Sequence, residues 1–187
     1  MDNLFTDEVK QKIRDKQYHH FGNIIDIVDF DMFDFSYLLR THQDQQFVWR
    51  PDKRRIEMEG LEKRGRIPEF AKDILQQLKK TFPKNYSSLH GFYGPTIDSK
   101  SFDIHRDAMD VLYLQVFGEI NWVILDDGGG TELTPDQTKC KIVESFYFKP
   151  GDLIWIPRGV LHFVDGVTPR LGFSFGVEND PDPATYV

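Results

Sequence analysis

The chain has 187 residues, 40% of them hydrophobic and 14% aromatic, a composition typical of one folded domain and not of a disordered chain. The formal net charge is −7, and residues 86–187 carry 15 acidic against 7 basic side chains, which argues against nonspecific nucleic-acid binding. No apolar run is long enough to span a membrane, and the N-terminal residues lack the features of a signal peptide. Cys140 is the only cysteine and cannot form an internal disulfide, so we expect a reducing compartment, the cytoplasm.

Residues 1–85 predict helices and irregular connections that form a layer of the same domain as the rest of the chain. Thr6 can cap a helix, and the spacing of Val9 and Ile13 places both side chains on one face of it. The β-branched residues of the segment 23–30 predict a first strand.

The clearest predicted helix begins at Pro68 and ends at Phe82, because proline suits an early helical position and Pro83 cannot continue the helix. Residues 31–40 predict a short helix or an irregular arm. The polar segment 41–65 predicts one strand, at residues 46–50, within a substrate-covering loop. Two basic clusters are interpreted as solvated surface: Arg50, Lys53, Arg54, Arg55 and Lys63, Arg64, Arg66.

From Tyr86 onward the chain consists of short β-like runs separated by turn residues. The runs are residues 86–93, 102–106, 111–116, 121–125, 141–148, 153–156, 161–164 and 171–177. Such regular spacing favours an antiparallel sandwich or small barrel. We therefore predict a mainly β domain in which residues 86–187 form the catalytic core and N-terminal helices pack on it.

Three residues in this half predict a metal centre. His105 and Asp107 are two residues apart, so on a strand both side chains point to the same face. His162 lies 57 residues after His105, behind a Pro-Arg-Gly turn and at the start of an apolar run. Two histidines and one carboxylate on one face are a ligand set that leaves positions open on Fe(II).

The remaining histidines have weaker claims. His19, His20 and His42 lie in polar surroundings and are not expected to be functional, whereas His90 lies in an apolar stretch and is either a core residue or one that supports the site. The glycine run 128–130 lacks the Gly-Lys-Ser/Thr ending of a phosphate-binding loop, so it predicts a flexible hairpin connection.

At this point the sequence resembles two related families. The second motif of cupins is matched by Gly151, Pro157, Gly159 and His162 in the string Gly-Asp-Leu-Ile-Trp-Ile-Pro-Arg-Gly-Val-Leu-His. The stretch from His105-x-Asp107 through Asp110-Val-Leu-Tyr-Leu-Gln-Val-Phe-Gly118 to Trp122 is similar to the corresponding stretch of JmjC-type and cupin-like oxygenases. The resemblance covers about Ser87 to Val177, which is half of the chain.

The resemblance implies a double-stranded β-helix (jelly roll), Fe(II) and the co-substrate 2-oxoglutarate. It implies that His105, Asp107 and His162 are the iron ligands. The activity that it implies is hydroxylation of a protein side chain or a small molecule.

One position departs from the JmjC-type pattern. Two residues after Gly118 that pattern has a lysine or arginine that binds the distal carboxylate of 2-oxoglutarate, and this chain has Ile120. Arg170, eight residues after His162, is the candidate to replace it, because a guanidinium is well shaped for bidentate carboxylate binding. Arg170 could alternatively be a surface residue at a strand end. Weaker candidates for hydrogen bonds to the same group are Ser174 and Tyr113.

The leading hypothesis is thus a 2-oxoglutarate-dependent dioxygenase. The alternative, which Ile120 favours, is a metal-binding cupin that does not use 2-oxoglutarate; an interaction protein with a vestigial site is a third and weaker reading. The sequence does not name the substrate, which is a peptide or a small molecule. The chain is shorter than ribosomal oxygenases with dimerisation and winged-helix segments, so a protein substrate is one option, and a homodimer is another open expectation.

Overall fold

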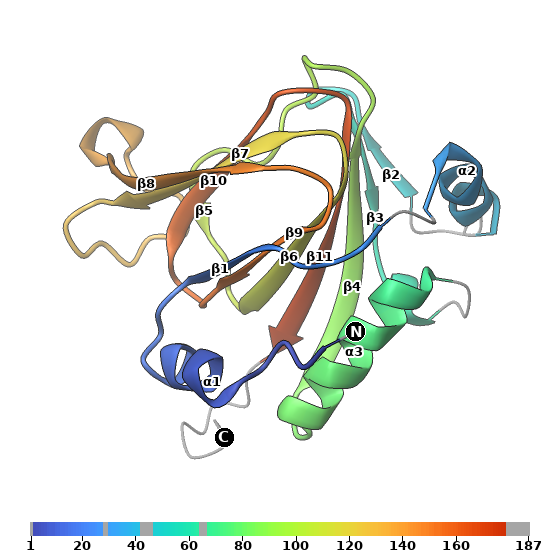
Figure 1. Cartoon of the computed structure of the whole chain (residues 1–187). Helices are drawn as coiled ribbons and strands as arrows, with labels where there is room; N and C mark the ends of the chain where they lie inside the picture. The colour runs from blue at the N-terminus through green and yellow to red at the C-terminus, as the bar shows by residue number, and fades with distance from the viewer. Residues whose placement is uncertain (1, 28–29, 42–46, 64–66, 179–187) are drawn as a thin grey trace.

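Two antiparallel sheets face each other and form the body of the molecule (Figure 1). The computed structural model describes residues 2–27, 30–41, 47–63 and 67–178. The larger sheet has seven strands in the order β1-β9-β6-β11-β4-β3-β2, and the smaller sheet has four in the order β5-β10-β7-β8. This arrangement confirms the predicted mainly β jelly roll, on which the N-terminal helices pack.

The strands are β1 (His19–Asn23), β2 (Phe47–Arg50), β3 (Arg55–Met58), β4 (Tyr86–Gly94), β5 (His105–Arg106), β6 (Asp110–Phe117), β7 (Ile120–Asp126), β8 (Lys141–Phe148), β9 (Asp152–Ile156), β10 (Leu161–Gly166) and β11 (Arg170–Glu178). The helices are α1 (Asp7–Arg14), α2 (Met32–Thr41) and α3 (Glu69–Thr81), with short 3-10 turns η1 (Leu61–Lys63) and η2 (Gln137–Lys139). Figure 1 shows α1 and α3 at the same end of the molecule, with β8 far from α3.

Helix α1 begins as predicted at Thr6, whose side chain accepts a hydrogen bond from the Val9 backbone N–H at 3.3 Å. Such a cap satisfies one of the unpaired N–H groups of the first turn and stabilises the helix by about 1 kcal/mol. Val9 and Ile13 are both buried, so the predicted apolar face is the one that packs on the body of the protein.

Helix α3 confirms the second helical prediction. Pro68 occupies its N-cap, and the chain leaves the helix at Phe82, whose N–H still donates to the Leu78 carbonyl at 2.7 Å. Ile74 and Leu78 are fully buried in the same apolar core as Phe173 of the larger sheet.

Alternation along β11 divides the two faces of the larger sheet. Leu171, Phe173 and Phe175 join the core that includes the helices, whereas Arg170 and Ser174 line a cavity on the opposite face. Burial of each such aromatic or aliphatic side chain contributes about 1.5–3 kcal/mol, so this face supplies much of the stability.

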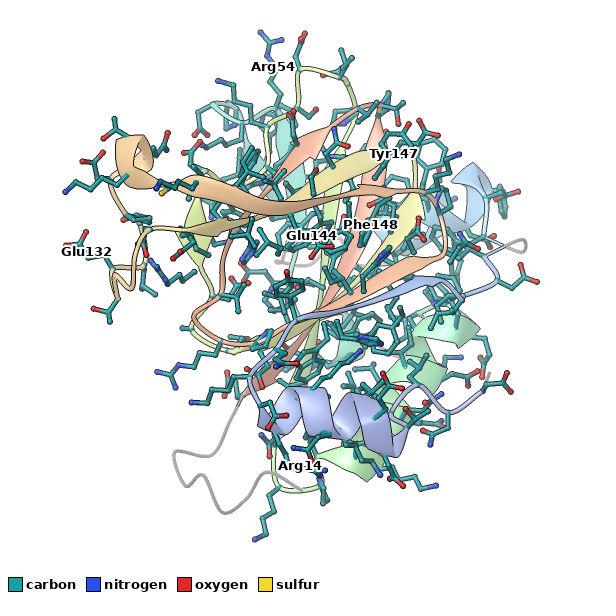
Figure 2. All side chains as sticks on the ribbon, turned by 60° about the vertical axis from the view of Figure 1, so that its left-hand side comes forward. Arg14, Arg54, Glu132, Glu144, Tyr147 and Phe148 are labelled. Atoms are coloured by element: carbon teal, nitrogen blue, oxygen red, sulfur yellow. The ribbon has the colours of Figure 1, made fainter. Side chains whose placement is uncertain are left out.

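Strand β8 shows the same alternation at the edge of the smaller sheet. Phe148 is fully buried inside the jelly roll, and the adjacent Tyr147 is 48% exposed (Figure 2). Glu144, on the same side as Phe148, accepts a hydrogen bond from the Tyr18 hydroxyl at 2.7 Å.

The prediction of a first strand over residues 23–30 was wrong in position. Strand β1 ends where that segment begins, because its ladder with β9 runs only from His19 to Asn23. Beyond it, the backbone N–H groups of Ile24 and Ile25 both donate to the Gly151 carbonyl at 3.2 Å, which is a turn and not a ladder. Residues 28–29 of the predicted strand lie outside the described residues.

Two other predictions need correction. The predicted strand over residues 102–106 is reduced to the two residues of β5, because only His105 and Arg106 pair with β10. The segment 41–65, predicted to hold one strand, contributes the hairpin of β2 and β3, and β3 pairs with β4. Residues 42–46 and 64–66, including His42, Arg64 and Arg66, lie outside the described residues.

Candidate metal centre

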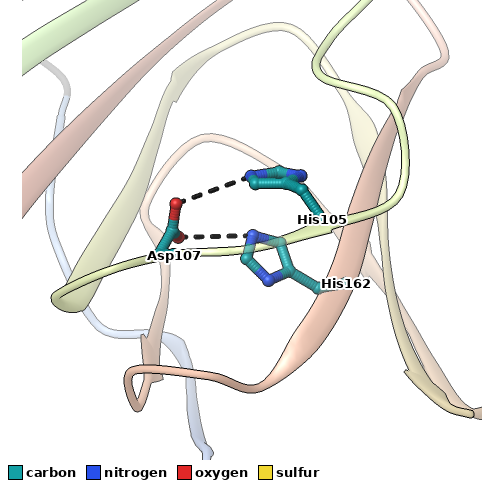
Figure 3. A group of neighbouring side chains, drawn as sticks. All are labelled: His105, Asp107 and His162. Carbon is teal, nitrogen blue, oxygen red and sulfur yellow. Dashed lines mark ion pairs between the residues drawn. The ribbon is translucent and has the colours of Figure 1, made fainter. Parts of the chain in front are cut away.

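Strands β5 and β10 bring the two predicted histidine ligands together. They pair antiparallel in a register that places His105 directly opposite His162. Asp107 follows two residues after His105 and points to the same side (Figure 3). Residues 57 positions apart in the sequence therefore meet because two short strands of the smaller sheet are neighbours.

The three side chains converge on one point. His105 Nε2 lies 3.5 Å from Asp107 Oδ1, and His162 Nε2 lies 3.5 Å from Asp107 Oδ2 (Figure 3). One ligand atom from each residue lies within 4.8 Å of the others. A divalent ion between them would have two nitrogen ligands and one oxygen ligand on one side, with the other side free.

The far nitrogen of each imidazole is held by a backbone carbonyl. His105 Nδ1 lies 2.7 Å from the Asp103 carbonyl oxygen, and His162 Nδ1 lies 3.0 Å from the Val160 carbonyl oxygen. A carbonyl can only accept, so both Nδ1 atoms carry a proton and the two Nε2 atoms are the ones that face Asp107. This second hydrogen bond is the usual support of a metal-binding histidine.

Burial and the charges within the centre together set the protonation of its three residues. Burial lowers the pKa of His162 to about 4, against the attraction of Asp107, so this imidazole is neutral and able to bind a metal at pH 7. Burial also disfavours the charged form of His105, but the hydrogen bond to Asp107 outweighs it and raises the pKa. For Asp107, burial is outweighed by the two histidines, which lower the pKa and keep the carboxylate ionised.

A cavity of about 90 Å³ opens beside these three residues, between the two sheets. It is lined by Arg55, Phe92, Tyr93, Gly94, Ser101, Phe102, His105, Asp107, Val111, Tyr113, Trp122, His162, Val164, Arg170 and Ser174. A larger open groove of about 1020 Å³ lies between the N-terminal segment, α2 and α3, but includes none of the three ligands. We assign the candidate site to the smaller cavity because His105, Asp107 and His162 line it.

Arg170 points into this cavity and is not a surface residue. It is 6% exposed, and its Nη2 donates to the Ser99 carbonyl at 2.6 Å. Its Nη1 is buried without a hydrogen-bond partner, although buried polar groups almost always have one. Burial lowers the pKa of Arg170 and outweighs the attraction of Asp165, which reflects the cost of burying this cation.

Two glycines make room for this guanidinium. A Cβ added at Gly166 would overlap Nη1 of Arg170, and one added at Gly94 would lie 3.2 Å from it. The free donor and the space around it fit a carboxylate held beside the metal position.

The other predicted ligand-binding residues line the same cavity. The Tyr113 hydroxyl donates to Gln115 Oε1 at 2.7 Å, and burial raises the pKa of Tyr113. Ser174 lies opposite Tyr113 in the pairing of β11 with β6. Ile120 is fully buried in the apolar interior of the jelly roll and does not line the cavity, so nothing at this position can bind an anion.

More than half of the chain matches a known protein family. Residues 68–183 match the profile of the JmjC domain family. The chain belongs to the JmjC domain family. The predicted resemblance to JmjC-type oxygenases is therefore confirmed at the level of the family.

Individual relatives are distant. This JmjC chain is 24% identical over 173 residues to the bifunctional lysine-specific demethylase and histidyl-hydroxylase NO66 of Dictyostelium discoideum, covering 86% of this chain and 32% of that protein. The ribosomal oxygenase YcfD of Escherichia coli has a TM-score of 0.69 and 15% identity, covering 98% of this chain and 54% of YcfD. The non-heme alpha ketoglutarate dependent carbocyclase SnoK from nogalamycin biosynthesis has a TM-score of 0.64 and 10% identity, covering 93% of this chain and 84% of SnoK. The JmjC chain thus spans a third to a half of the first two relatives.

Among the residues that the structure describes, no helix is long and apolar enough to cross a membrane.

The cavity of this JmjC domain includes one residue that the sequence analysis missed. Arg55, predicted to be solvated surface, is 5% exposed on β3 and lines the cavity. Its guanidinium forms a buried ion pair with Glu57, donates to the Lys100 carbonyl at 3.2 Å and lies 3.9 Å from the Phe102 ring centroid. The Phe102 ring in turn lies 5.3 Å from that of His105. The alternation of Arg55 and Glu57 with apolar neighbours was the only available signal.

The rest of the first basic cluster pairs with acidic residues. Lys53 contacts Asp103 at 2.8 Å, and Arg54 contacts Asp98 at 3.3 Å, both near the surface. Arg54 points away from the body of the protein (Figure 2).

Proposed function

We propose that this JmjC domain is an Fe(II)- and 2-oxoglutarate-dependent oxygenase in which His105, Asp107 and His162 bind the iron. One observation carries the proposal. Two imidazole Nε2 atoms and a carboxylate converge beside a cavity that also contains the unpartnered Nη1 of Arg170. A ligand set for a metal and a free cationic donor for a carboxylate are the two parts that such a site needs.

The donor set fits Fe(II). Neutral imidazole and carboxylate are suitable ligands for it, and three ligands on one side leave positions for the co-substrate and O2. When bound, the iron and 2-oxoglutarate supply the oxidising chemistry, in which 2-oxoglutarate is converted to succinate and CO2 and a substrate C–H bond is hydroxylated.

The chain's own residues bind 2-oxoglutarate and orient the metal-binding imidazoles. Arg170 receives the distal carboxylate of 2-oxoglutarate through Nη1, while Ser99 fixes the guanidinium through its carbonyl. Tyr113 and Ser174 line the same part of the cavity and add hydroxyl groups to it. The carbonyls of Asp103 and Val160 hold both imidazoles through Nδ1, so that Nε2 is the atom directed at the metal position.

The relatives support this proposal. YcfD has been solved in complex with cobalt and 2-oxoglutarate, and SnoK is described as alpha ketoglutarate dependent. The names of NO66 and YcfD describe action on lysine, histidine and the ribosome, which favours a protein side chain as the substrate over a small molecule. Cytoplasmic location and a homodimer stay predictions.

A metal-binding cupin without 2-oxoglutarate is the second candidate function. The observation in its favour is Ile120, an apolar and fully buried residue where the JmjC-type pattern has a basic one. In that case Arg170 would bind a different anion.

The deciding experiment is an anaerobic titration of the Fe(II)-loaded protein with 2-oxoglutarate, followed by the visible metal-to-ligand charge-transfer band. We expect a band in the wild type and in Ile120→Val, and none in His162→Ala. Bound iron without a band at any 2-oxoglutarate concentration would contradict the proposal and favour the second candidate.

A further inference from the structure

The first two ligands of the proposed iron site depend on the shortest strand of the molecule. Strand β5 is an edge strand of two residues, His105 and Arg106, and Asp107 follows directly after it. Its ladder with β10 consists of two residue pairs. So short a ladder supplies few hydrogen bonds to fix the backbone that carries two ligands.

The side chain between the two ligands supplies further contacts. Because alternate residues point to opposite faces, Arg106 extends away from the metal position. Its Nη2 lies 2.7 Å from Asp127 Oδ1, its Nη1 donates to the Glu132 carbonyl at 2.6 Å, and its Nε donates to the Gly159 carbonyl at 3.0 Å. The Arg106 and Asp127 side chains are only 8% and 7% exposed, whereas the Glu132 side chain points into solvent (Figure 2).

Backbone hydrogen bonds follow the same path. The Arg106 N–H donates to the Leu133 carbonyl at 2.9 Å, and the Gly159 N–H donates to the Asp107 carbonyl at 3.1 Å. Gly159 belongs to the turn that leads into β10 and His162. Arg106 therefore connects the segment of the first two ligands to the turn before the third, and both to the loop after β7.

The glycine run of that loop fits this role. Asp127 Oδ1 accepts from the Gly130 N–H at 3.0 Å, and a Cβ added at Gly130 would lie 2.5 Å from Asp127 Oδ2. Gly130, unlike Gly128 and Gly129, does not have a positive φ, so alanine there would act through the Asp127 carboxylate and not through backbone strain.

We propose that Arg106, held by Asp127, is a positioning residue that fixes the geometry of the three metal ligands from the opposite face of β5. The inference rests on the proposed function insofar as His105, Asp107 and His162 bind the metal. Loss of such an outer partner is expected to weaken metal binding by about 10- to 100-fold.

The test is a calorimetric titration of the metal-free full chain with Co(II), together with the visible Co(II) spectrum and the melting temperature. We expect Arg106→Leu and Asp127→Asn to bind Co(II) at least about 10-fold more weakly than the wild type, with an altered spectrum. Gly130→Ala should likewise weaken Co(II) binding and alter the Co(II) spectrum. Asp126→Asn is the matched control, because Asp126 is the neighbouring residue at the end of β7, the substitution removes the same charge, and in the described structure the Asp126 carboxylate accepts only from the Gly128 N–H.

The outcomes separate the two proposals. Unchanged Co(II) affinity and spectrum in Asp127→Asn and Gly130→Ala would contradict the inference, even if their melting temperatures fell, because stability alone would then be the role of Arg106. Asp127→Asn and Gly130→Ala decide the question if Arg106→Leu does not fold. A wild type without Co(II) affinity would contradict the proposed function itself.

Discussion

On β11, Leu171 and Phe173 belong to the apolar core that includes residues of the helices, whereas Arg170 and Ser174 line the cavity on the other side of the same sheet. Leu171 and Phe173 are buried in this core and need no ligand to complete their surroundings. Arg170, in contrast, is buried with an unpartnered Nη1, which costs free energy unless a ligand completes it. One alternating strand thus carries a face that stabilises the fold and a face that is incomplete without a ligand.

The largest expected effect comes from the apolar face. Phe173→Ala removes a fully buried ring from the core, so we expect a loss of about 3–5 kcal/mol in the free energy of unfolding. Urea denaturation would measure it. The folded fraction should bind 2-oxoglutarate in the presence of Fe(II) with unchanged affinity, and a large loss of that affinity would show that the two faces are not independent.

Arg170→Met should give the opposite pattern. We expect 2-oxoglutarate affinity to fall by at least about 10-fold, which is about 1.4 kcal/mol or more, because the charge-assisted bond to the distal carboxylate is lost. Stability of the metal-free protein should stay the same or rise, since an unpaired buried cation is removed. Titration of the Fe(II) protein and urea denaturation measure the two quantities. Arg170→Lys is the control that keeps the charge without the planar donor pair.

His162, which lines the cavity, should also contribute to the pH dependence of stability in the metal-free protein. An unfolded histidine has a pKa of 6.5, whereas burial lowers the pKa of His162 to about 4, so protons bind the unfolded state preferentially. The contribution of His162 is present above pH 6.5 and is lost as the pH falls toward 4. We expect the wild type to lose about 2 kcal/mol more than His162→Gln between pH 7 and pH 5. Urea denaturation of both proteins at pH 7 and pH 5 measures this difference. An equal loss of stability in the wild type and in His162→Gln would contradict the prediction.

The smallest expected effect is that of Ser174→Ala. Ser174 is on the cavity side but carries a single neutral hydroxyl, so we expect stability within about 0.5 kcal/mol of the wild type and a 2-oxoglutarate affinity only a few-fold lower. The same titration measures it. A loss as large as that of Arg170→Met would mean that the hydroxyl is a main ligand of the co-substrate.

The sequence predicted those elements whose pattern is local. Helix α3 and the later strands have their own periodicity and turn residues, and spacing and turn chemistry were enough to select His105, Asp107 and His162, which the structure brings together. The predicted contributions of Arg170, Ser174 and Tyr113 to ligand binding stay predictions.

Elements that depend on distant partners were not predictable in the same way. Strand β3 is polar in sequence and forms because it pairs with β4 on one side and β2 on the other. Arg55 is buried on it because Glu57 and the Lys100 carbonyl complete its hydrogen bonds, and Lys100 lies 45 residues away. The alternation of Arg55 and Glu57 with Ile56 and Met58 was the only local signal, and it does not reveal the distant carbonyl that completes the hydrogen bonds of this arginine.

One feature of the second half joins the two ends of the proposed co-substrate site. His162 is on β10 and Arg170 is the first residue of β11, so two consecutive strands carry a proposed metal ligand in the smaller sheet and the free guanidinium in the larger one. The separation of iron and guanidinium is then fixed by a three-residue connection, 167–169. In the proposed function, that connection selects the length of the dicarboxylate: a 2-oxo acid one methylene shorter or longer than 2-oxoglutarate could chelate the iron or reach Arg170, but not both without strain.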